Sequence, residues 1–249
     1  LIPQNPNMKP YKIAIFFSGL ERSLAGSAFN MRVDECRSAA YALKAFAGME
    51  YGKFKDTYLR EVPYGTFKAF EHRLPETWRR RAEHWYTEYD RVEQGAEAWR
   101  KGDLQTYGQL SFESGHSSIV NWETGSPELK KLYEIMTHTE GIYGGRFSGA
   151  GFKGCCMALI DPAYEEEIAA QVTKEYLAQF PHLEGVLDVV YNPAQTQLLL
   201  DAEKRGIIAM NGLWMLVAQA KSASELWQGK SIPDTETPRI EALLRRSMR

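Results

Sequence analysis

The chain has 249 residues, 44% of them hydrophobic and 25% charged, a composition typical of a globular protein with one large domain or two small ones. Its 30 Lys and Arg residues nearly balance its 32 Asp and Glu residues, so a nucleic-acid partner is not expected. No apolar run approaches about 18 residues, and therefore no membrane-spanning helix is expected. Three cysteines suggest neither a disulfide framework nor a zinc site and favour a cytoplasmic location. The chain begins with Leu1 rather than Met, as expected of a fragment or a processed product.

The first part of the chain predicts one strand followed by helices. Residues 1–10 hold three prolines and are predicted to be a linker. Residues 11–17 form a short apolar run of the kind found in strands. Apolar residues recur at helical spacing over residues 28–47 and again over residues 76–99. A further helix is predicted to begin within residues 104–112.

The middle of the chain predicts a capped helix, a glycine-rich loop, a strand and another helix. The tripeptide Ser-Pro-Glu at residues 126–128 combines an N-cap, a proline at the first helical position and an acid in the first turn, and this helix is predicted to reach about residue 139. Residues 141–154 contain six glycines. A buried strand is predicted over residues 155–160 and an amphipathic helix over residues 163–180. This order favours an α+β sandwich with helices on one face of a sheet.

The pattern changes after Pro181. A short strand is predicted over residues 187–190 and a short helix over residues 196–204. A strongly apolar helix is predicted over residues 213–227, and a helix with a basic end over residues 237–249.

The glycine-rich stretch leaves two interpretations open. Glycine allows positive φ, and successive backbone N–H groups in such a loop can bind an anion, with Arg146 and Lys153 adding positive charge. The alternative is a tight turn that joins two strands. The stretch is not a Walker motif, because no Gly-Lys-Ser/Thr closes it, and no strand–loop–helix unit marks a dinucleotide site.

These residues resemble a known family. Residues 144–156 read Gly-Gly-Arg-Phe-Ser-Gly-Ala-Gly-Phe-Lys-Gly-Cys-Cys and resemble the third conserved motif of the GHMP small-molecule kinases, in the form found in the galactokinase, L-arabinokinase and galacturonokinase group. Other segments agree in order and spacing: residues 22–32 and 35–36, the helical set His84, Glu88, Arg91 and Val92, and residues 107–110, 114–119 and 125–129.

The resemblance implies a GHMP-kinase C-terminal domain over residues 11–185, with a ferredoxin-like α/β sandwich. It further implies ATP-dependent phosphorylation of a free sugar at its anomeric hydroxyl, with Mg²⁺ in the complete enzyme. The residues that it places against the substrate are Phe29, Gly149, Ala150, Gly151 and Phe152. In galactokinases the position of Phe29 resembles a tyrosine whose hydroxyl touches the sugar, and phenylalanine cannot donate that hydrogen bond. A uronic acid or a pentose is therefore as plausible a substrate as galactose.

The family's phosphate-binding motif, sugar-signature segment and catalytic Asp belong to an N-terminal half that nothing in this chain matches. No catalytic residue is therefore assigned, and neither kinase activity nor a bound cofactor is expected for this chain alone. A complementary N-terminal half or a second copy of the chain is the expected protein partner. The alternative is a sugar-binding or scaffold protein without catalysis.

The last part of the chain, residues 186–249, resembles the C-terminal segment of shikimate dehydrogenase and implies a small helical tail like the end of a Rossmann domain. The resemblance places Tyr191 and Gln219 against shikimate and Met215 near the nicotinamide. The glycine-rich dinucleotide turn and the catalytic domain of that family are not matched, so a dehydrogenase remnant without activity is expected.

Other residues have plainer interpretations. His84 and His116 are more often hydrogen-bonded structural residues than ligands or bases. The arginines at residues 79–81 are expected on a solvated helix face. No metal site is predicted.

Overall fold

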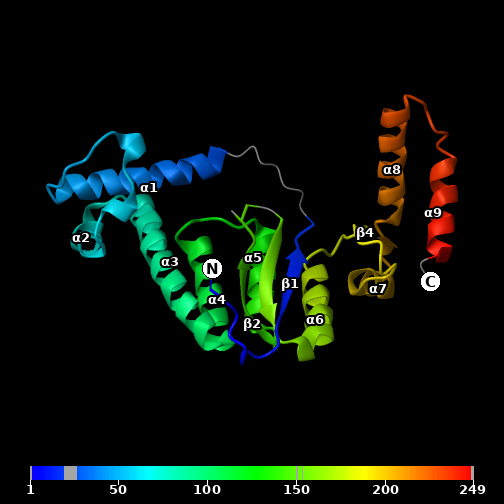
Figure 1. The fold of residues 1–249 in the computed structure, drawn as a ribbon, viewed down its shortest axis with the longest axis horizontal. Helices are drawn as coiled ribbons and strands as arrows, with labels where there is room; N and C mark the ends of the chain where they lie inside the picture. The colour runs from blue at the N-terminus through cyan, green and yellow to red at the C-terminus, as the bar shows by residue number, and fades with distance from the viewer. Residues whose placement is uncertain (1, 20–26, 150, 153, 248–249) are drawn as a thin grey trace. The chain divides into compact units, whose positions relative to one another are not determined.

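The computed structural model describes residues 2–19, 27–149, 151–152 and 154–247, and its ribbon is drawn in Figure 1. The chain divides into two compact units, Leu1–Ile168 and Ala169–Arg249, which are described separately. The domain boundary near residue 185 rests on the sequence resemblances and stays a prediction.

An antiparallel sheet in the order β1–β3–β2 lies in the first unit (Figure 1). Strands β1 (Lys12–Phe17) and β3 (Cys155–Ile160) confirm the two predicted strands. Strand β2 (Ile142–Phe147) corrects the prediction of a loop across the whole glycine-rich stretch. Pairing with β3, from Gly144 opposite Leu159 onwards, holds these residues extended despite the weak strand preference of glycine.

Helix α5 (Pro127–His138) covers one face of this sheet. The helix begins where the sequence predicts, because the Ser126 hydroxyl accepts a hydrogen bond from the Leu129 N–H at 3.3 Å. Apolar side chains from α5, β2 and β3 are buried in this layer: Leu129, Leu132, Ile135, Met136, Phe147, Cys156, Ala158 and Ile160. The α+β class is therefore confirmed.

The opposite face of the sheet carries exposed apolar side chains. Ile13, Ile15 and Phe17 alternate along β1 and are 63%, 67% and 56% exposed. Met157, the partner of Ile15 in the register, is 40% exposed. These four residues are called the exposed sheet face below.

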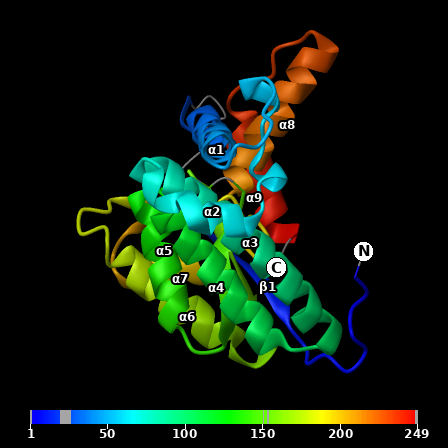
Figure 2. The same cartoon turned by 90° about the vertical axis from the view of Figure 1, so that its left-hand side faces the viewer.

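Helices α3 (Glu76–Lys101) and α4 (Leu104–Val120) pack side by side, as Figures 1 and 2 show, and α4 lies against β2. Helix α3 confirms its prediction, and α4 begins at Leu104, within the segment where the start of a helix was predicted. The backbones of α4 and β2 meet at two glycines, since a Cβ added to Gly144 would overlap the carbonyl oxygen of Gly108. The absence of side chains at this pair allows the helix to lie directly against the strand.

Helix α1 (Ser27–Phe46) and the short helix α2 (Tyr64–Phe70) pack with the first half of α3 (Figure 2). Helix α1 confirms the helix predicted over residues 28–47. Short 3-10 turns at Phe54–Asp56, Leu59–Glu61 and Glu71–Arg73 connect these helices. Their common core is apolar: Ala39, Ala40, Leu43, Leu59, Val62, Phe67, Leu74, Ala82 and Tyr86.

Helix α6 (Glu165–Leu177) follows a 3-10 turn at Pro162–Tyr164 and runs from the first unit into the second. In the second unit, β4 (Gly185–Leu187) and β5 (Ile208–Met210) pair in parallel. Strand β4 begins two residues earlier than predicted, and β5 was not predicted, because both strands are only three residues long.

The helices of the second unit agree with their predictions. Helix α7 (Gln197–Lys204) joins β4 to β5, so the three elements form a β–α–β unit. Helices α8 (Leu213–Gln228) and α9 (Glu236–Ser247) follow. The likeness of this tail to the end of a Rossmann domain stays a prediction. None of the described helices in either unit has the length and apolarity needed to cross a membrane.

Candidate functional site

The glycine loop, defined as residues 148–154, is the connection between β2 and β3. The Ser148 N–H donates to the Cys155 carbonyl at 2.9 Å, and the Ser18 N–H donates to the Gly154 carbonyl at 2.8 Å. Gly149 and Gly151 have φ values of 72° and 74°, which side chains rarely allow. The loop therefore joins two strands, as the turn interpretation predicted, and a role of the loop in anion binding stays a prediction.

Gly151 is buried at the base of this loop. A Cβ at this position would lie 2.6 Å from the Phe147 ring, and its carbonyl accepts the Gly125 N–H at 2.8 Å. Phe152 is half-buried beside it. Ala150 and Lys153, two of the residues singled out from the sequence, lie outside the described residues.

Arg146, which the sequence suggested as a positive charge for the loop, is engaged elsewhere. Its guanidinium donates to the Ser114 hydroxyl at 2.5 Å and lies 3.4 Å from the Glu88 carboxylate. Arg91 pairs with the same carboxylate at 2.7 Å. Burial raises the pKa of Glu88, but the hydrogen bonds from Ser114 and Arg91 outweigh it and hold the pKa below its usual value. The carboxylate therefore stays charged between two guanidinium groups.

Phe29 lies near the start of α1 and is 48% exposed. Three residues later, the Arg32 Nε donates to the Trp122 carbonyl at 2.7 Å. Trp122 belongs to residues 121–125, called the connecting loop below, which also supplies the Gly125 N–H to Gly151. The structure thus connects the Phe29 end of α1 to the glycine loop through one intervening segment.

An arginine–glutamate cluster holds the connecting loop. Arg81 is fully buried, and it pairs with Glu35 at 2.6 Å and with Glu123 at 2.5 Å. Arg80 also pairs with Glu123 at 2.6 Å, and Arg32 completes the cluster. The expectation of a solvated face at residues 79–81 is therefore wrong for Arg81, because two carboxylates and the Asn121 carbonyl satisfy its guanidinium inside the protein.

Glu123 has a φ of 56°, the left-handed region that a residue other than glycine rarely adopts. The hydrogen bond from Arg81, supported by the charges of Arg80 and Arg32, holds its pKa below the usual value despite partial desolvation. The strained backbone is therefore held in place by a side chain that is charged at neutral pH.

Sequence reasoning missed this cluster, although one signal for it was present. Polar residues on α3 recur at spacings of three and four, at Arg81, His84, Glu88 and Arg91. Residues at this spacing lie along one face of a helix. This face of α3 packs on α4. The facing residues of α4 are also polar and small: Ser114, Ser117, Ser118 and Asn121.

His84 is a structural residue of this polar interface, as the sequence favoured. Its Nδ1 lies 2.9 Å from the Ser117 hydroxyl, and its ring lies 5.1 Å from the ring of Trp122. Burial lowers the pKa of His84 to about 4, although the carboxylate of Glu88 opposes the shift. The imidazole is therefore neutral at physiological pH.

This shift predicts a pH dependence of stability. Between pH 6.5 and about 4 the unfolded chain binds a proton at His84 that the folded chain does not, so the stability falls as the pH falls through this range. Between pH 7 and pH 5 the wild type is expected to lose about 1–2 kcal/mol more unfolding free energy than His84→Gln. Urea unfolding at both pH values tests this, with the exposed His116→Gln as the control. An equal loss in all three proteins would contradict the prediction.

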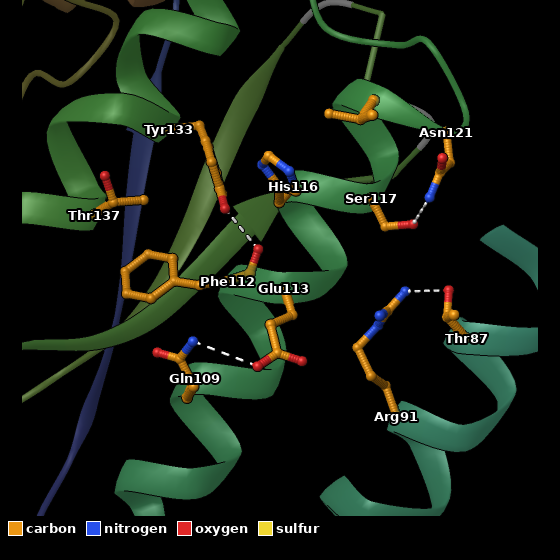
Figure 3. A pocket seen from close by; sticks show the side chains of 11 residues that line it. Thr87, Arg91, Gln109, Phe112, Glu113, His116, Ser117, Asn121, Tyr133 and Thr137 are labelled. Atoms are coloured by element: carbon orange, nitrogen blue, oxygen red, sulfur yellow. Dashed lines mark hydrogen bonds between the residues drawn. The ribbon is translucent and has the colours of Figure 1, made fainter. Parts of the chain in front are cut away.

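A groove of about 510 Å³ lies between α3, α4 and α5 (Figure 3). His116 and Glu113 line it, and the Tyr133 hydroxyl at its wall donates to the Phe112 carbonyl at 2.6 Å (Figure 3). None of the residues that line this groove is Phe29 or a residue of the glycine loop. The groove therefore reaches the connecting loop at Asn121 but is not lined by Phe29 or by the glycine loop.

In the second unit the residues singled out from the sequence lie on two adjoining segments. Tyr191 is exposed in the segment after β4, and the Gly212 N–H donates to the neighbouring Val190 carbonyl at 3.0 Å. Met215 and Gln219 lie one turn apart on α8, which begins at that contact. The arrangement leaves the roles of these three side chains as predictions.

Across the described ranges of both units, no three His, Cys, Asp or Glu side chains gather closely enough to hold a metal ion.

Comparisons with known proteins agree with the sequence resemblance for the first unit. Residues 96–178 match the family model described as "GHMP kinases C terminal". The galacturonokinase of Arabidopsis thaliana is 41% identical over 169 residues, which cover 68% of this chain and 39% of that protein. The galactokinase of Roseiflexus sp. (strain RS-1) is 33% identical over 165 residues, covering 66% of this chain and 40% of that protein.

A solved structure shows the same fold. The galactokinase of Lactococcus lactis, determined as a complex with galactose, aligns with a TM-score of 0.62 and 26% identity over 71% of this chain and 44% of its own. The chain spans about 40% of the length of the curated relatives that it matches. Residues 96–178 therefore match the C-terminal domain of GHMP kinases, and about two thirds of this chain is similar in sequence to a galacturonokinase and to galactokinases.

Proposed function

We propose that the first unit is the C-terminal part of an ATP-dependent sugar kinase that phosphorylates the anomeric hydroxyl of a free sugar. The glycine loop between β2 and β3 carries this proposal, because it combines the family motif with the positive φ values of Gly149 and Gly151. ATP supplies the phosphoryl group, and the loop contributes backbone N–H groups.

The described residues offer groups that suit the phosphates of ATP but none that suit its Mg²⁺ ion. Glycine-loop backbone suits phosphate oxygens, whereas no described cluster of carboxylates suits Mg²⁺. We therefore place the Mg²⁺ ligands and the catalytic carboxylate in the remaining part of the enzyme, which the relatives carry over the other three fifths of their length.

We favour a uronic acid such as galacturonate over galactose as the substrate. Phe29 offers a ring face but no hydroxyl to donate to a sugar oxygen. The higher identity to the galacturonokinase, 41% against 33% for the bacterial galactokinase, supports the same choice.

The exposed sheet face supports the proposal that this domain works with a further part of the enzyme. Ile13, Ile15, Phe17 and Met157 form an apolar surface on strands whose other face is buried. Apolar surface of this kind is stabilised when another domain covers it. We propose that the N-terminal kinase part docks there, either in the same polypeptide or as a separate chain.

A complementation assay tests this function. The chain is mixed with the N-terminal three fifths of the Arabidopsis galacturonokinase, and ADP release from ATP is measured with galacturonate, galactose and L-arabinose. We expect turnover only in the mixture, with kcat/KM for galacturonate at least about tenfold above that for galactose. Ile15→Lys is expected to abolish association and turnover without unfolding the domain, because this side chain is 67% exposed.

The other outcomes separate the alternatives. Association of the two parts without turnover on any sugar would contradict the kinase proposal, and saturable sugar binding measured by calorimetry would then identify a binding protein without catalysis. Turnover on galactose above that on galacturonate would contradict the substrate preference alone.

For the second unit we propose descent from the C-terminal segment of a shikimate-dehydrogenase-like domain. The parallel pair β4 and β5, joined through α7, supports this proposal because such units build dinucleotide-binding domains. Catalysis is not expected, so NADP reduction in the presence of shikimate should stay at background. Measurable reduction would instead assign a dehydrogenase function to Tyr191, Met215 and Gln219.

A further inference from the structure

The arginine–glutamate cluster joins two surfaces that the proposed kinase needs. On one side lies the beginning of α1, where Phe29 is exposed three residues before Arg32. On the other side lies the glycine loop, whose Gly151 carbonyl accepts the Gly125 N–H. Glu123 stands between them in the connecting loop, two residues before Gly125.

We propose that Glu123 is a positioning residue, which sets the glycine loop relative to the Phe29 end of α1. This role in substrate binding rests on the proposed kinase function, whereas the mechanical coupling does not. Glu123 acts through Arg32, Arg81 and the backbone of the connecting loop.

The contacts on the helix side fix both the side chain and the main chain of Glu123. Its carboxylate forms ion pairs with Arg81 at 2.5 Å and with Arg80 at 2.6 Å, both from α3. Arg32 of α1 lies 3.7 Å from the carboxylate and donates to the Glu123 carbonyl at 3.4 Å. Glu35 of α1 shares Arg81 with Glu123, so the carboxylate is connected to α1 twice.

The contacts on the loop side leave little freedom. The Thr124 N–H and hydroxyl both donate to the Ser118 carbonyl, at 3.0 and 3.1 Å. Gly125 has a φ of 97°, and a Cβ there would lie 2.8 Å from the Phe147 ring. Phe147 also packs on Gly151, so a shift of the connecting loop is transmitted to the glycine loop by direct contact.

The strained backbone at Glu123 separates this proposal from a purely structural one. A glycine at position 123 relieves the positive φ and removes the carboxylate. If Glu123 only tolerates a strained turn, Glu123→Gly stabilises the connecting loop and slows exchange of the Gly125 amide. If the ion pairs position the loop, Glu123→Gly and Glu123→Gln both destabilise the connecting loop and speed exchange of the Gly125 amide.

Amide hydrogen exchange measured by NMR on the full chain tests the coupling without any need for enzyme activity. In Glu123→Gln and Glu123→Gly we expect the Gly125 amide, which the Gly151 carbonyl protects, to exchange at least about tenfold faster than in the wild type. Glu123→Asp is expected to restore part of the protection. The control is Glu97→Gln, which removes an exposed carboxylate that pairs with Arg100 and Lys101 on α3.

Two results would overturn the proposal. One is a Gly125 exchange rate that stays within about twofold of the wild type in both variants. The other is an increase of the same size at the central amides of β3, because that would show general destabilisation. In the complemented enzyme the two variants are expected to raise the KM for the sugar, with Glu123→Asp recovering part of it. If no turnover is found at all, the exchange result still decides the coupling.

Discussion

Arg81→Ala is expected to lower the unfolding free energy of the first unit by about 3–5 kcal/mol. The arginine is fully buried. Its removal leaves the carboxylate of Glu35 and one carboxylate oxygen of Glu123 without their principal partner inside the protein. The carbonyl of Asn121 also loses a donor. Unpaired buried charge is one of the most destabilising defects known in folded proteins.

Urea unfolding followed by tryptophan fluorescence measures this change. Arg79→Ala is the matched control, since Arg79 lies two residues earlier on α3 and its side chain forms no ion pair or hydrogen bond with another described residue. A loss in the control of less than about 0.5 kcal/mol is expected. Equal losses in the two variants would mean that the helix responds to any arginine removal and that the cluster is unimportant.

Gly144→Ala is expected to destabilise the same unit by about 3 kcal/mol or more. An added methyl group would overlap the carbonyl oxygen, carbonyl carbon and Cα of Gly108, all of them backbone atoms of α4 that cannot rotate away. Relief requires α4 to move off the β2 strand, which would also separate Ser114 from Arg146.

The control for this substitution is Gly65→Ala on α2. Beyond the adjoining residues and the backbone of α2 itself, no described heavy atom lies within 4 Å of the added carbon, and alanine is the better helix former. This variant is expected to be neutral or to gain up to about 1 kcal/mol. A Gly144→Ala variant that unfolds at the wild-type urea concentration would contradict the close contact between α4 and β2.

The elements that the sequence predicted well are those with local signals. Helix α5 has its cap, its proline and its acid within residues 126–128, and β3 is a continuous apolar run bounded by Gly154 and Asp161. Helix α3 shows its apolar spacing over seven turns. In each case the residues that decide the structure are neighbours in the chain.

The elements whose existence or full extent was not predicted depend on distant residues. Strand β2 has the sequence Ile-Tyr-Gly-Gly-Arg-Phe, whose glycines favour a loop until β3 and α4 hold them. Helix α4 continues through the serine- and glycine-rich residues 111–118 because small side chains suit a close approach to β2 and α3. Propensity alone predicts neither.

The candidate site divides in the same way. The glycine loop was found from its composition, but the connecting loop was not, because residues 121–124 carry no motif of their own. Their position follows from Arg32 and Arg81, which lie about 90 and 40 residues earlier in the chain. Only the folded chain brings these residues together.

The strand order also determines when the sheet can assemble during synthesis. Strand β1 pairs only with β3, and its first residue, Lys12, lies opposite Ile160. At about 5–20 residues per second, a ribosome needs on the order of ten seconds to make the intervening chain. For much of that interval the Ile13–Phe17 segment is already outside the exit tunnel, while its partner strand β3 has not yet been made. Nascent chains of this protein should therefore bind a cotranslational chaperone at β1 and release it only after β3 has emerged.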